Sequence, residues 1–344
     1  MTAKKKIKTV KIKKIEPGIV LRGGRLEIIS DGGIPSWDIE DKDIFIGEKN
    51  LKLIASSSEK ILAEVVGYDE QFMELPVLFK NDQVKIKEGT VYIPIKICSN
   101  HILGSSPVCD IYGNIYFVDL RELQENQQSI IYKYLIDEKK LIPYIIGIPA
   151  PTSLSYFEGV LYITSMVDRK LYRCVAQGEY EVMAQGLGSV FGTAVNSLGE
   201  IFVGDQTGSV FKVDSTGKAA FFTSIPESFK GYHFVFSKDD DLFISIPSNV
   251  GKNSIYRVTR EQSVKPYLET MNILGGIAIN PKGEFFWVEN TREDGAVFKI
   301  DPEGHVRKIL SASFILGLTF SSNGDLVVTD LHNIYIIKKH WMED

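Results

Sequence analysis

Gly199-Glu200-Ile201-Phe202-Val203-Gly204-Asp205-Gln206-Thr207-Gly208-Ser209-Val210-Phe211-Lys212-Val213 is the stretch that decides the fold. It contains a tight turn, an apolar strand, a polar turn and a second strand. Glycine tolerates the positive φ angles of tight turns, and short apolar runs bounded by Gly and Asp favour strands. Variants of this stretch occur six times along the chain. The repetition predicts a repeat architecture built from one supersecondary unit.

The central strands of the six copies are evenly spaced. Their first residues lie 46, 40, 41, 43 and 41 positions apart. The strands are expected at 115–118, 161–164, 201–204, 242–245, 285–288 and 326–329. A period of about 40–50 residues with four strands per copy is typical of β-propeller blades. We therefore predict an all-β protein with a six-bladed β-propeller over residues 97–344.

The strands around each central strand also recur. A strand of small residues, such as 192–195, comes before each hairpin turn and suits the crowded axis of a ring. A strand with an aromatic residue, such as 210–213, follows the central one. The sixth copy ends after three strands, so its fourth strand is expected from 91–98, where it would close the ring. The same residues could instead complete the small domain that precedes the propeller, and the sequence leaves both options open.

The N-terminal part has a different pattern. Residues 15–96 contain short alternating apolar runs separated by Gly, Asp, Asn and Ser. This pattern predicts a small immunoglobulin-like β-sandwich. The first 14 residues contain seven lysines and are expected to form a basic leader that enters an edge strand. A basic arm for nucleic acid or anionic lipid is the alternative for these residues.

Composition limits the class of protein. The net charge of −5 provides no overall reason to expect a nucleic-acid partner. No stretch approaches the roughly 18 apolar residues of a membrane span, and no secretory leader pattern is visible. The three cysteines lack metal-ligand spacing and fit small buried residues in a reducing compartment. We therefore expect a cytoplasmic protein.

Two resemblances follow from these motifs. Residues 7–96 resemble the TIG (IPT) family of immunoglobulin-like domains through Pro17, the strand 24–28 and Phe45-Ile46-Gly47. Residues 99–340 resemble the NHL and regucalcin/gluconolactonase-like propellers. The motif Gly-x-Ala-x-Asn-x-x-Gly-Glu-Ile-Phe-Val-Gly-Asp at 192–205 carries this resemblance, together with its partner at 276–290.

The second resemblance implies a lactone-hydrolysing activity as one option. Metal-dependent lactonases of that superfamily bind a divalent ion through a Glu, two Asn and an Asp at the starts of the inner strands. The corresponding positions here carry 105–107, 192–193, 275–276 and 316–317, which are Ser, Pro, Gly, Thr and Leu. None of these residues is an expected ligand, so the departure argues against a gluconolactonase-type metal reaction.

Polar residues gather at one face of the predicted ring, where central strands end and inner strands begin. The candidates for catalysis are His233, Glu289 and Asp205, and the candidates for ligand binding are Tyr232, Asp119, Asn290 and Asp330. Such a rim could hold a divalent cation such as Ca²⁺ or supply a general base. An Asp at a strand end could equally cap the following turn, and His233 could be a structural histidine.

Two classes of function fit these features. A binding propeller would recognise a small-molecule ligand or a protein partner at its face. A lactone or ester hydrolase would act at the mouth of the central channel, with His233 as its base. The sequence has no phosphate loop, nucleophile elbow or His-Glu-x-x-His motif. No cofactor is therefore certain, and a divalent cation is the one that the rim could hold.

Overall fold

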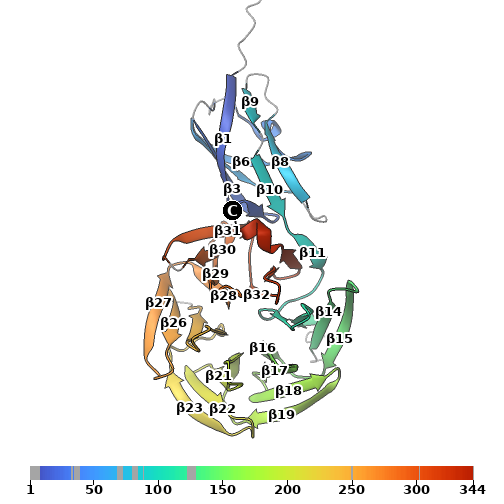
Figure 1. Ribbon diagram of the computed structural model, residues 1–344, viewed down its shortest axis with the longest axis vertical. Coiled ribbons are helices and arrows are strands. Elements are labelled where there is room, and N and C mark those ends of the chain that lie inside the picture. The colour runs from blue at the N-terminus through green and yellow to red at the C-terminus, as the bar shows by residue number, and fades with distance from the viewer. Residues whose placement is uncertain are drawn as a thin grey trace, which may run out of the picture.

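The computed structural model describes residues 8–31, 34, 39–67, 73–79, 84–87, 89–121, 129–248, 251–301 and 303–343. These residues form antiparallel four-stranded sheets arranged around a common axis, with a smaller group of strands at one edge of the ring (Figure 1). The expected all-β fold is confirmed, and the radial arrangement of the sheets is consistent with a β-propeller.

The ring sheets follow one another along the chain, each running from its inner to its outer strand. The first has β12 (Val108–Cys109), β13 (Ile115–Asp119), β14 (Ile130–Leu135) and β15 (Lys140–Ile146). The next has β16 (Pro151–Phe157), β17 (Val160–Ser165), β18 (Lys170–Ala176) and β19 (Glu179–Gln185). It is followed by β20 (Val190–Val195), β21 (Ile201–Asp205), β22 (Ser209–Val213) and β23 (Ala219–Ser224). Then come β24 (His233–Phe236), β25 (Leu242–Ile246), β26 (Asn253–Val258) and β27 (Val264–Thr270).

The last two groups of ring strands each pair with a strand from the N-terminal part of the chain. One contains β28 (Ile273–Ile279), β29 (Phe285–Asn290), β30 (Gly295–Ile300) and β31 (Val306–Ala312). The other contains β32 (Gly317–Phe320), β33 (Leu326–Thr329), β34 (Ile334–Ile337) and, as its outer strand, β11 (Ile95–Cys98). Ile95 lies opposite Ile336 in an antiparallel pair. Residues from the N-terminal half of the chain therefore complete the sheet that ends it.

The core lies between neighbouring ring sheets. The central strands β13, β21 and β25 are buried along their whole length because each sheet packs against a neighbour on both faces. Phe117, Phe286 and Trp287 are among the largest fully buried side chains. The turns between inner and central strands have the expected chemistry, since Gly199, Gly283 and Gly324 all have positive φ angles.

The N-terminal module has two layers of strands. One sheet has the order β6-β7-β3-β1-β9, with β6 (Lys52–Ser56), β7 (Lys60–Glu64), β3 (Arg25–Ser30), β1 (Lys8–Glu16) and β9 (Val84–Lys87). The second layer has β5 (Lys49–Asn50), β4 (Ile44–Ile46), β8 (Met73–Phe79), β10 (Gly89–Ile93) and β2 (Ile19–Val20). Leu26, Ile28, Ile44 and Ile61 are buried between the layers. The lysine-rich strand β1 pairs with β3 and β9, and the residues before Lys8 lie outside the described part of the chain.

Both options for residues 91–98 are realised. Strand β10 pairs with β8 in the module, whereas β11 pairs with β34 in the ring. Pro94 lies between the two strands. Because proline has no N–H group to donate to a ladder, it separates the two pairings.

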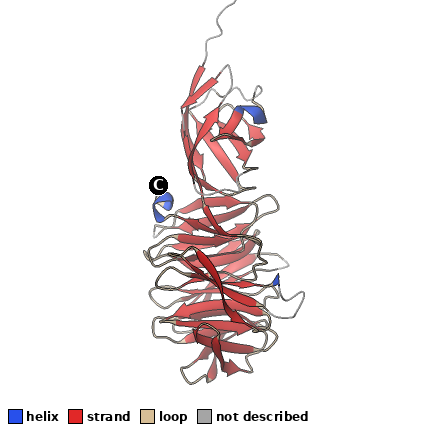
Figure 2. Ribbon diagram, turned by 90° about the vertical axis from the view of Figure 1, so that its right-hand side faces the viewer, coloured by secondary structure: helices blue, strands red, loops and turns tan. Residues whose placement is uncertain are grey.

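The module and the ring share one continuous sheet. Strand β2 pairs in parallel with β10 on one side and with β31 on the other, where Ile19 lies opposite Leu310. Ile19 and Leu21 are buried in a cluster with ring residues such as Leu310 and Trp341. Figure 2 shows the module extending from the edge of the ring. This pairing holds the module in a fixed place beside the ring.

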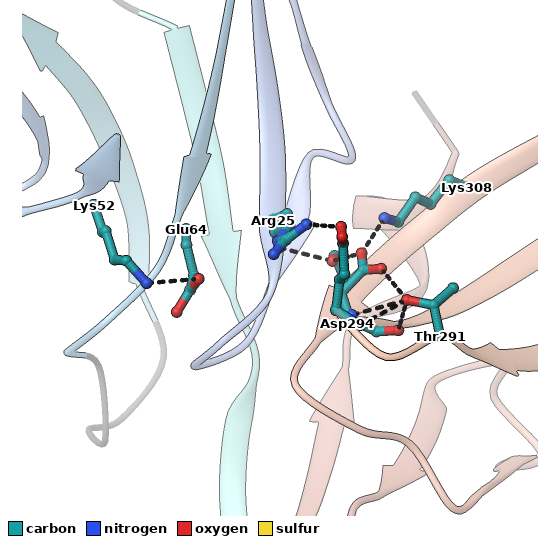
Figure 3. A network of polar contacts seen from close by, with 8 residues as sticks. Arg25, Lys52, Glu64, Thr291, Asp294 and Lys308 are labelled. Atoms are coloured by element: carbon teal, nitrogen blue, oxygen red, sulfur yellow. Dashed lines mark hydrogen bonds and ion pairs between the residues drawn. The ribbon is translucent and has the colours of Figure 1, made fainter. Parts of the chain in front are cut away.

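Polar contacts reinforce this junction. The backbone N–H of Leu21 donates to the carbonyl of Ser311 over 2.8 Å. Arg25 forms an ion pair with Glu293, and Lys308 lies 2.7 Å from Asp294 in the neighbouring loop (Figure 3). The Lys52–Glu64 pair in the same view lies within the module. The junction therefore combines apolar burial, backbone pairing and charge pairing.

Candidate functional site

A cavity of about 270 Å³ lies among the inner strands of the ring. Its polar lining residues include Ser106, Ser153, Ser155, Tyr156, Thr193, His233 and Thr319. Apolar residues of the same strands, including Phe236 and Phe320, complete the wall. None of the described residues that line this cavity is a carboxylate. The cavity is therefore polar without being acidic.

His233 takes part in a contact that crosses the ring. Its Nδ1 atom lies 3.0 Å from the Oγ atom of Ser106. The inner strands contact one another in the order β12, β16, β20, β24, β28, β32 and back to β12. His233 begins β24 and Ser106 lies two residues before β12, so the two residues lie on opposite sides of this ring. The hydrogen bond therefore spans the channel.

Glycines make room for this crossing. Gly317, at the start of β32, lies so close to Ser106 that an added Cβ atom would be 2.6 Å from the Ser106 Cα. A Cβ atom on Gly276 would lie 2.7 Å from the Ser106 Oγ. Gly276 and Gly317 are among the inner-strand residues that stand in place of the metal ligands expected from the lactonase resemblance. In this chain they allow close packing around the Ser106–His233 pair.

The imidazole of His233 is neutral at pH 7. Burial lowers the pKa of His233 from its ordinary value of 6.5 to about 4, because the surroundings disfavour the charged form. A neutral imidazole can accept or donate one hydrogen bond at each nitrogen. A neutral imidazole at this position is suited to a proton-accepting or ligand-binding role.

This shift predicts a pH dependence of stability. The unfolded chain binds a proton at His233 at a higher pH than the folded chain does, so folding is favoured above pH 6.5 and loses this contribution as the pH falls towards 4. We expect the loss to be about 2 kcal/mol, below the full value for such a shift, because the His233 side chain is partly exposed and solvent screens part of its charge.

Urea unfolding of the protein and of His233→Gln between pH 4 and 7 measures this contribution. The difference in unfolding free energy between the two proteins should change by that amount over this range. Equal pH dependence of the two proteins would show that His233 is not buried in its neutral form. Carboxylates with lowered pKa values affect both proteins alike, so they cancel in the comparison.

Asp205 and Asp330 cap turns. One oxygen of Asp205 accepts hydrogen bonds from the backbone N–H groups of Thr207 and Ser209 over 3.0 and 2.9 Å. Asp330 accepts from the backbone N–H and the side-chain amide of Asn333 in the same way. Neither carboxylate belongs to the cavity lining. The capping interpretation describes the observed contacts of both residues.

Asp119, the last residue of β13, lies in a buried cluster of polar side chains. Its carboxylate is 2.6 Å from the Nδ1 atom of His101 and accepts a 2.8 Å hydrogen bond from the Nε–H of Arg121. Burial by itself raises the pKa of Asp119, but the hydrogen bonds from His101 and Arg121 outweigh it and hold the pKa well below its usual range. His101 carried no sequence signal, because its partner is separated from it by 18 residues.

The remaining candidates also have structural contacts. Glu289 accepts hydrogen bonds from Trp287, Asn272 and Thr270. Asn290 donates to the carbonyl of Ile315 and accepts from its N–H, both over 2.8 Å. The hydroxyl of Tyr232 donates to the Pro226 carbonyl over 3.1 Å, and burial raises the pKa of Tyr232 to about 12. The structure brings none of these residues to the cavity wall, where His233 and Ser106 meet.

One group of metal-ligating side chains occurs among the described residues. Asp301, Glu303 and His305 place ligand atoms within 4.8 Å of one another, in the turn between β30 and β31. Glu303 and His305 are exposed, and Asp301 already accepts a hydrogen bond from the His305 backbone over 2.8 Å. This group is remote from the residues at which the sequence located a possible cation.

Comparisons with known proteins define the fold class. No protein-family model matches the chain, and no curated protein matches it. A structural-genomics protein of unknown function from Bacteroides thetaiotaomicron is similar over 96% of this chain and 98% of its own, with 10% identity and a TM-score of 0.61. An auxiliary nutrient binding protein from Bacteroides ovatus covers the same shares, with 13% identity and a TM-score of 0.53. At these identities the likeness shows the fold alone, and it extends over nearly the whole of each chain.

Propeller enzymes are also among the similar structures. A gluconolactonase from Xanthomonas campestris covers 55% of this chain and 76% of its own, with 13% identity and a TM-score of 0.45. No argument about activity follows from a likeness of this size.

No helix among the described residues is long and apolar enough to cross a membrane.

Proposed function

We propose that the chain is a ligand-binding six-bladed β-propeller whose central cavity holds a small, uncharged polar molecule. The observation that carries the proposal is a wall of hydroxyl groups and a neutral imidazole, with no carboxylate among the described lining residues. Hydroxyl groups both donate and accept hydrogen bonds, which suits a ligand with several hydroxyl or carbonyl groups. A charged ligand would lose its hydration without gaining a partner of opposite charge.

The wider architecture supports a binding role. In this proposal residues 97–344 form six blades, closed by β11, and residues 15–96 form an immunoglobulin-like module of the TIG type. The module is joined to the ring through β2, and none of its described residues lines the cavity. A rigid ring with a preformed pocket is a common way to build a small-molecule site. The proposed partner is a small molecule, and the cytoplasm is the proposed location.

Ligand binding can be tested with matched variants. Calorimetry with a panel of uncharged sugars and lactones, and with their acid counterparts, should detect binding in the uncharged group only. Thr193→Val removes one lining hydroxyl without changing its size and should weaken binding about fivefold to tenfold, since a hydrogen bond contributes about 1 kcal/mol. Ser215→Ala, in an exposed turn, is the control. Preference for the acids, or equal weakening by both variants, would contradict the proposal.

The Ser106–His233 pair supports a second function, the hydrolysis of a lactone or ester. In this reaction His233 accepts the Ser106 proton while the Oγ atom attacks the carbonyl carbon. The alkoxide leaving group then takes the proton from His233, and water releases the acyl group from Ser106. The low basicity of His233 predicts slow turnover. Glu289 and Asp205 have no role in this reaction scheme, because neither residue lines the cavity.

Labelling separates this second function from binding alone. A fluorophosphonate probe followed by mass spectrometry should modify Ser106 and should fail with Ser106→Ala or His233→Ala. Ser153→Ala, which removes another hydroxyl from the same wall, should retain labelling. An unlabelled Ser106 in a protein that still binds its ligand would leave binding as the function.

A further inference from the structure

The central cavity has different chemistry at its two ends. Ser106, Ser153 and His233, at or near the starts of the inner strands, form the polar end. At the other end, one residue of each inner strand lies opposite the first buried residue of the adjacent central strand. All of these residues line the cavity, and we call them the apolar collar: Cys109, Tyr156, Val195, Phe236, Ile279 and Phe320.

The apolar collar and the polar end are two levels of one cavity. Phe236 and His233 are three residues apart in β24, and Tyr156 and Ser153 are three residues apart in β16. Because a strand advances by about 3.3 Å per residue, the two levels are separated by about 10 Å along the channel. The hairpin turns that follow the collar residues all lie in the described part of the chain. One small molecule can therefore contact both levels.

The apolar collar is uncharged, and its side chains are all half-buried. Burial, followed by the nearby Asp110 carboxylate, raises the pKa of the Cys109 thiol to about 12, so this side chain is neutral at pH 7. A neutral cysteine behaves as a small apolar residue. The collar therefore leaves apolar surface partly exposed at the cavity, and covering such surface with an apolar group is favourable.

The aromatic members of the apolar collar are fixed by rings of the preceding ring sheets. Each supporting ring belongs to the second residue of its central strand, so the same contact recurs in every second sheet. Aromatic side chains that are already held in place lose little freedom when a flat apolar group packs against them. The pairs, with ring centroids 4.8 to 5.8 Å apart, are Tyr156 with Tyr116, Phe236 with Phe202, and Phe320 with Phe286.

We propose that the ligand of the central cavity carries an aryl group beside its uncharged polar part, and that the apolar collar binds this aryl group. The inference rests on the proposed function, because the polar end holds the rest of the molecule through hydroxyl groups and His233. A ligand that lacked an apolar group would leave the collar in contact with water. The substrate class is therefore an aryl-substituted polyol, such as an aryl glycoside.

The first experiment is calorimetric titration of the full-length protein with the methyl and phenyl β-glycosides of glucose, galactose and mannose, and with phenol. The phenyl member of a pair that binds should bind at least about tenfold more tightly than the methyl member, because it buries more apolar surface. Equal affinities within the pairs overturn the inference and leave the binding of an uncharged polar ligand intact. Phenol binding as tightly as the phenyl glycosides supports the collar but contradicts the proposed function. Absence of binding by every probe overturns the inference.

Matched variants locate the aryl group. Phe236→Leu removes a ring, and Val195→Thr replaces a methyl group with a hydroxyl group of similar size. Each should weaken binding of the phenyl member about fivefold, with the methyl member changed less than about twofold. Phe221→Leu and Val175→Thr make the same changes at side chains that are 62% exposed, and they should retain both affinities.

A variant of the polar part of the wall separates the two proposals. Thr193→Val should weaken binding of both members of a pair by the same factor, because it acts on the polar part that they share. Equal weakening of the methyl and phenyl members by Phe236→Leu, or equal effects of the collar and control variants, rejects the collar as the aryl site. Unfolding curves of the variants check that they are folded.

Discussion

A chain that begins at residue 91 should unfold at a clearly lower urea concentration than the full-length chain, although it keeps the closing strand β11. The truncation removes β2, which covers the edge of β31. It also removes Ile19 and Leu21, which are 1% and 5% exposed in the cluster they share with the ring. Burial of such side chains contributes about 1.5–3 kcal/mol each, so we expect a loss of about 3–6 kcal/mol.

Point variants separate the junction from the rest of the module. In the full-length chain, Ile19→Ala together with Leu21→Ala should lower the unfolding free energy by a similar amount. Ile54→Ala together with Val66→Ala changes two exposed side chains of the same module and should have little effect. If residues 91–344 unfold with the full-length free energy, the ring does not depend on the module.

Gly317→Ala should destabilise the ring by about 3 kcal/mol, the upper end of the usual overpacking range. The new Cβ atom would lie 2.6 Å from the Cα of Ser106, and a backbone atom cannot move aside as a flexible side chain can. Strand β32 would have to separate from the segment before β12. The Ser106–His233 contact across the channel would be lost, so binding in the central cavity should weaken as well.

Gly18→Ala is the matched control for this variant. No atom lies within 4 Å of a Cβ atom built on Gly18, and neither glycine has a positive φ angle. The two substitutions therefore differ in the space available and not in backbone strain. Urea unfolding and ligand calorimetry measure both effects. A Gly317→Ala protein as stable as the Gly18→Ala protein would show that the inner ring can open at this point.

Local features of the sequence were sufficient to predict the strands of the ring. The hairpin glycines, the apolar central strands and the period near 41 residues all concern neighbouring residues, so they are visible without the fold. The position of the closing strand could be narrowed to residues 91–98, because the sixth copy of the repeat ends after three strands and needs a fourth. The choice between module and ring depended on two partners, β8 and β34, which are distant in sequence from each other.

The candidate site was predicted less well than the fold. An aspartate at a strand end has the same local sequence whether it caps a turn or faces a channel, as Asp205 and Asp330 illustrate. His233 was selected as a candidate because it is the one ionisable residue that the sequence places at an inner-strand start. Its partner Ser106 was placed at the same face, but their contact spans 127 residues and depends on closure of the ring.

The sequence by itself determined that this protein is an all-β repeat with a distinct N-terminal module, because turn chemistry and strand periodicity are local properties of the chain. Only the tertiary structure decided how Pro94 divides residues 91–98 between two sheets, and how β2 joins the module to the ring. It also placed Ser106 opposite His233. These arrangements depend on packing and ring closure, which bring together residues whose local sequences contain no information about one another.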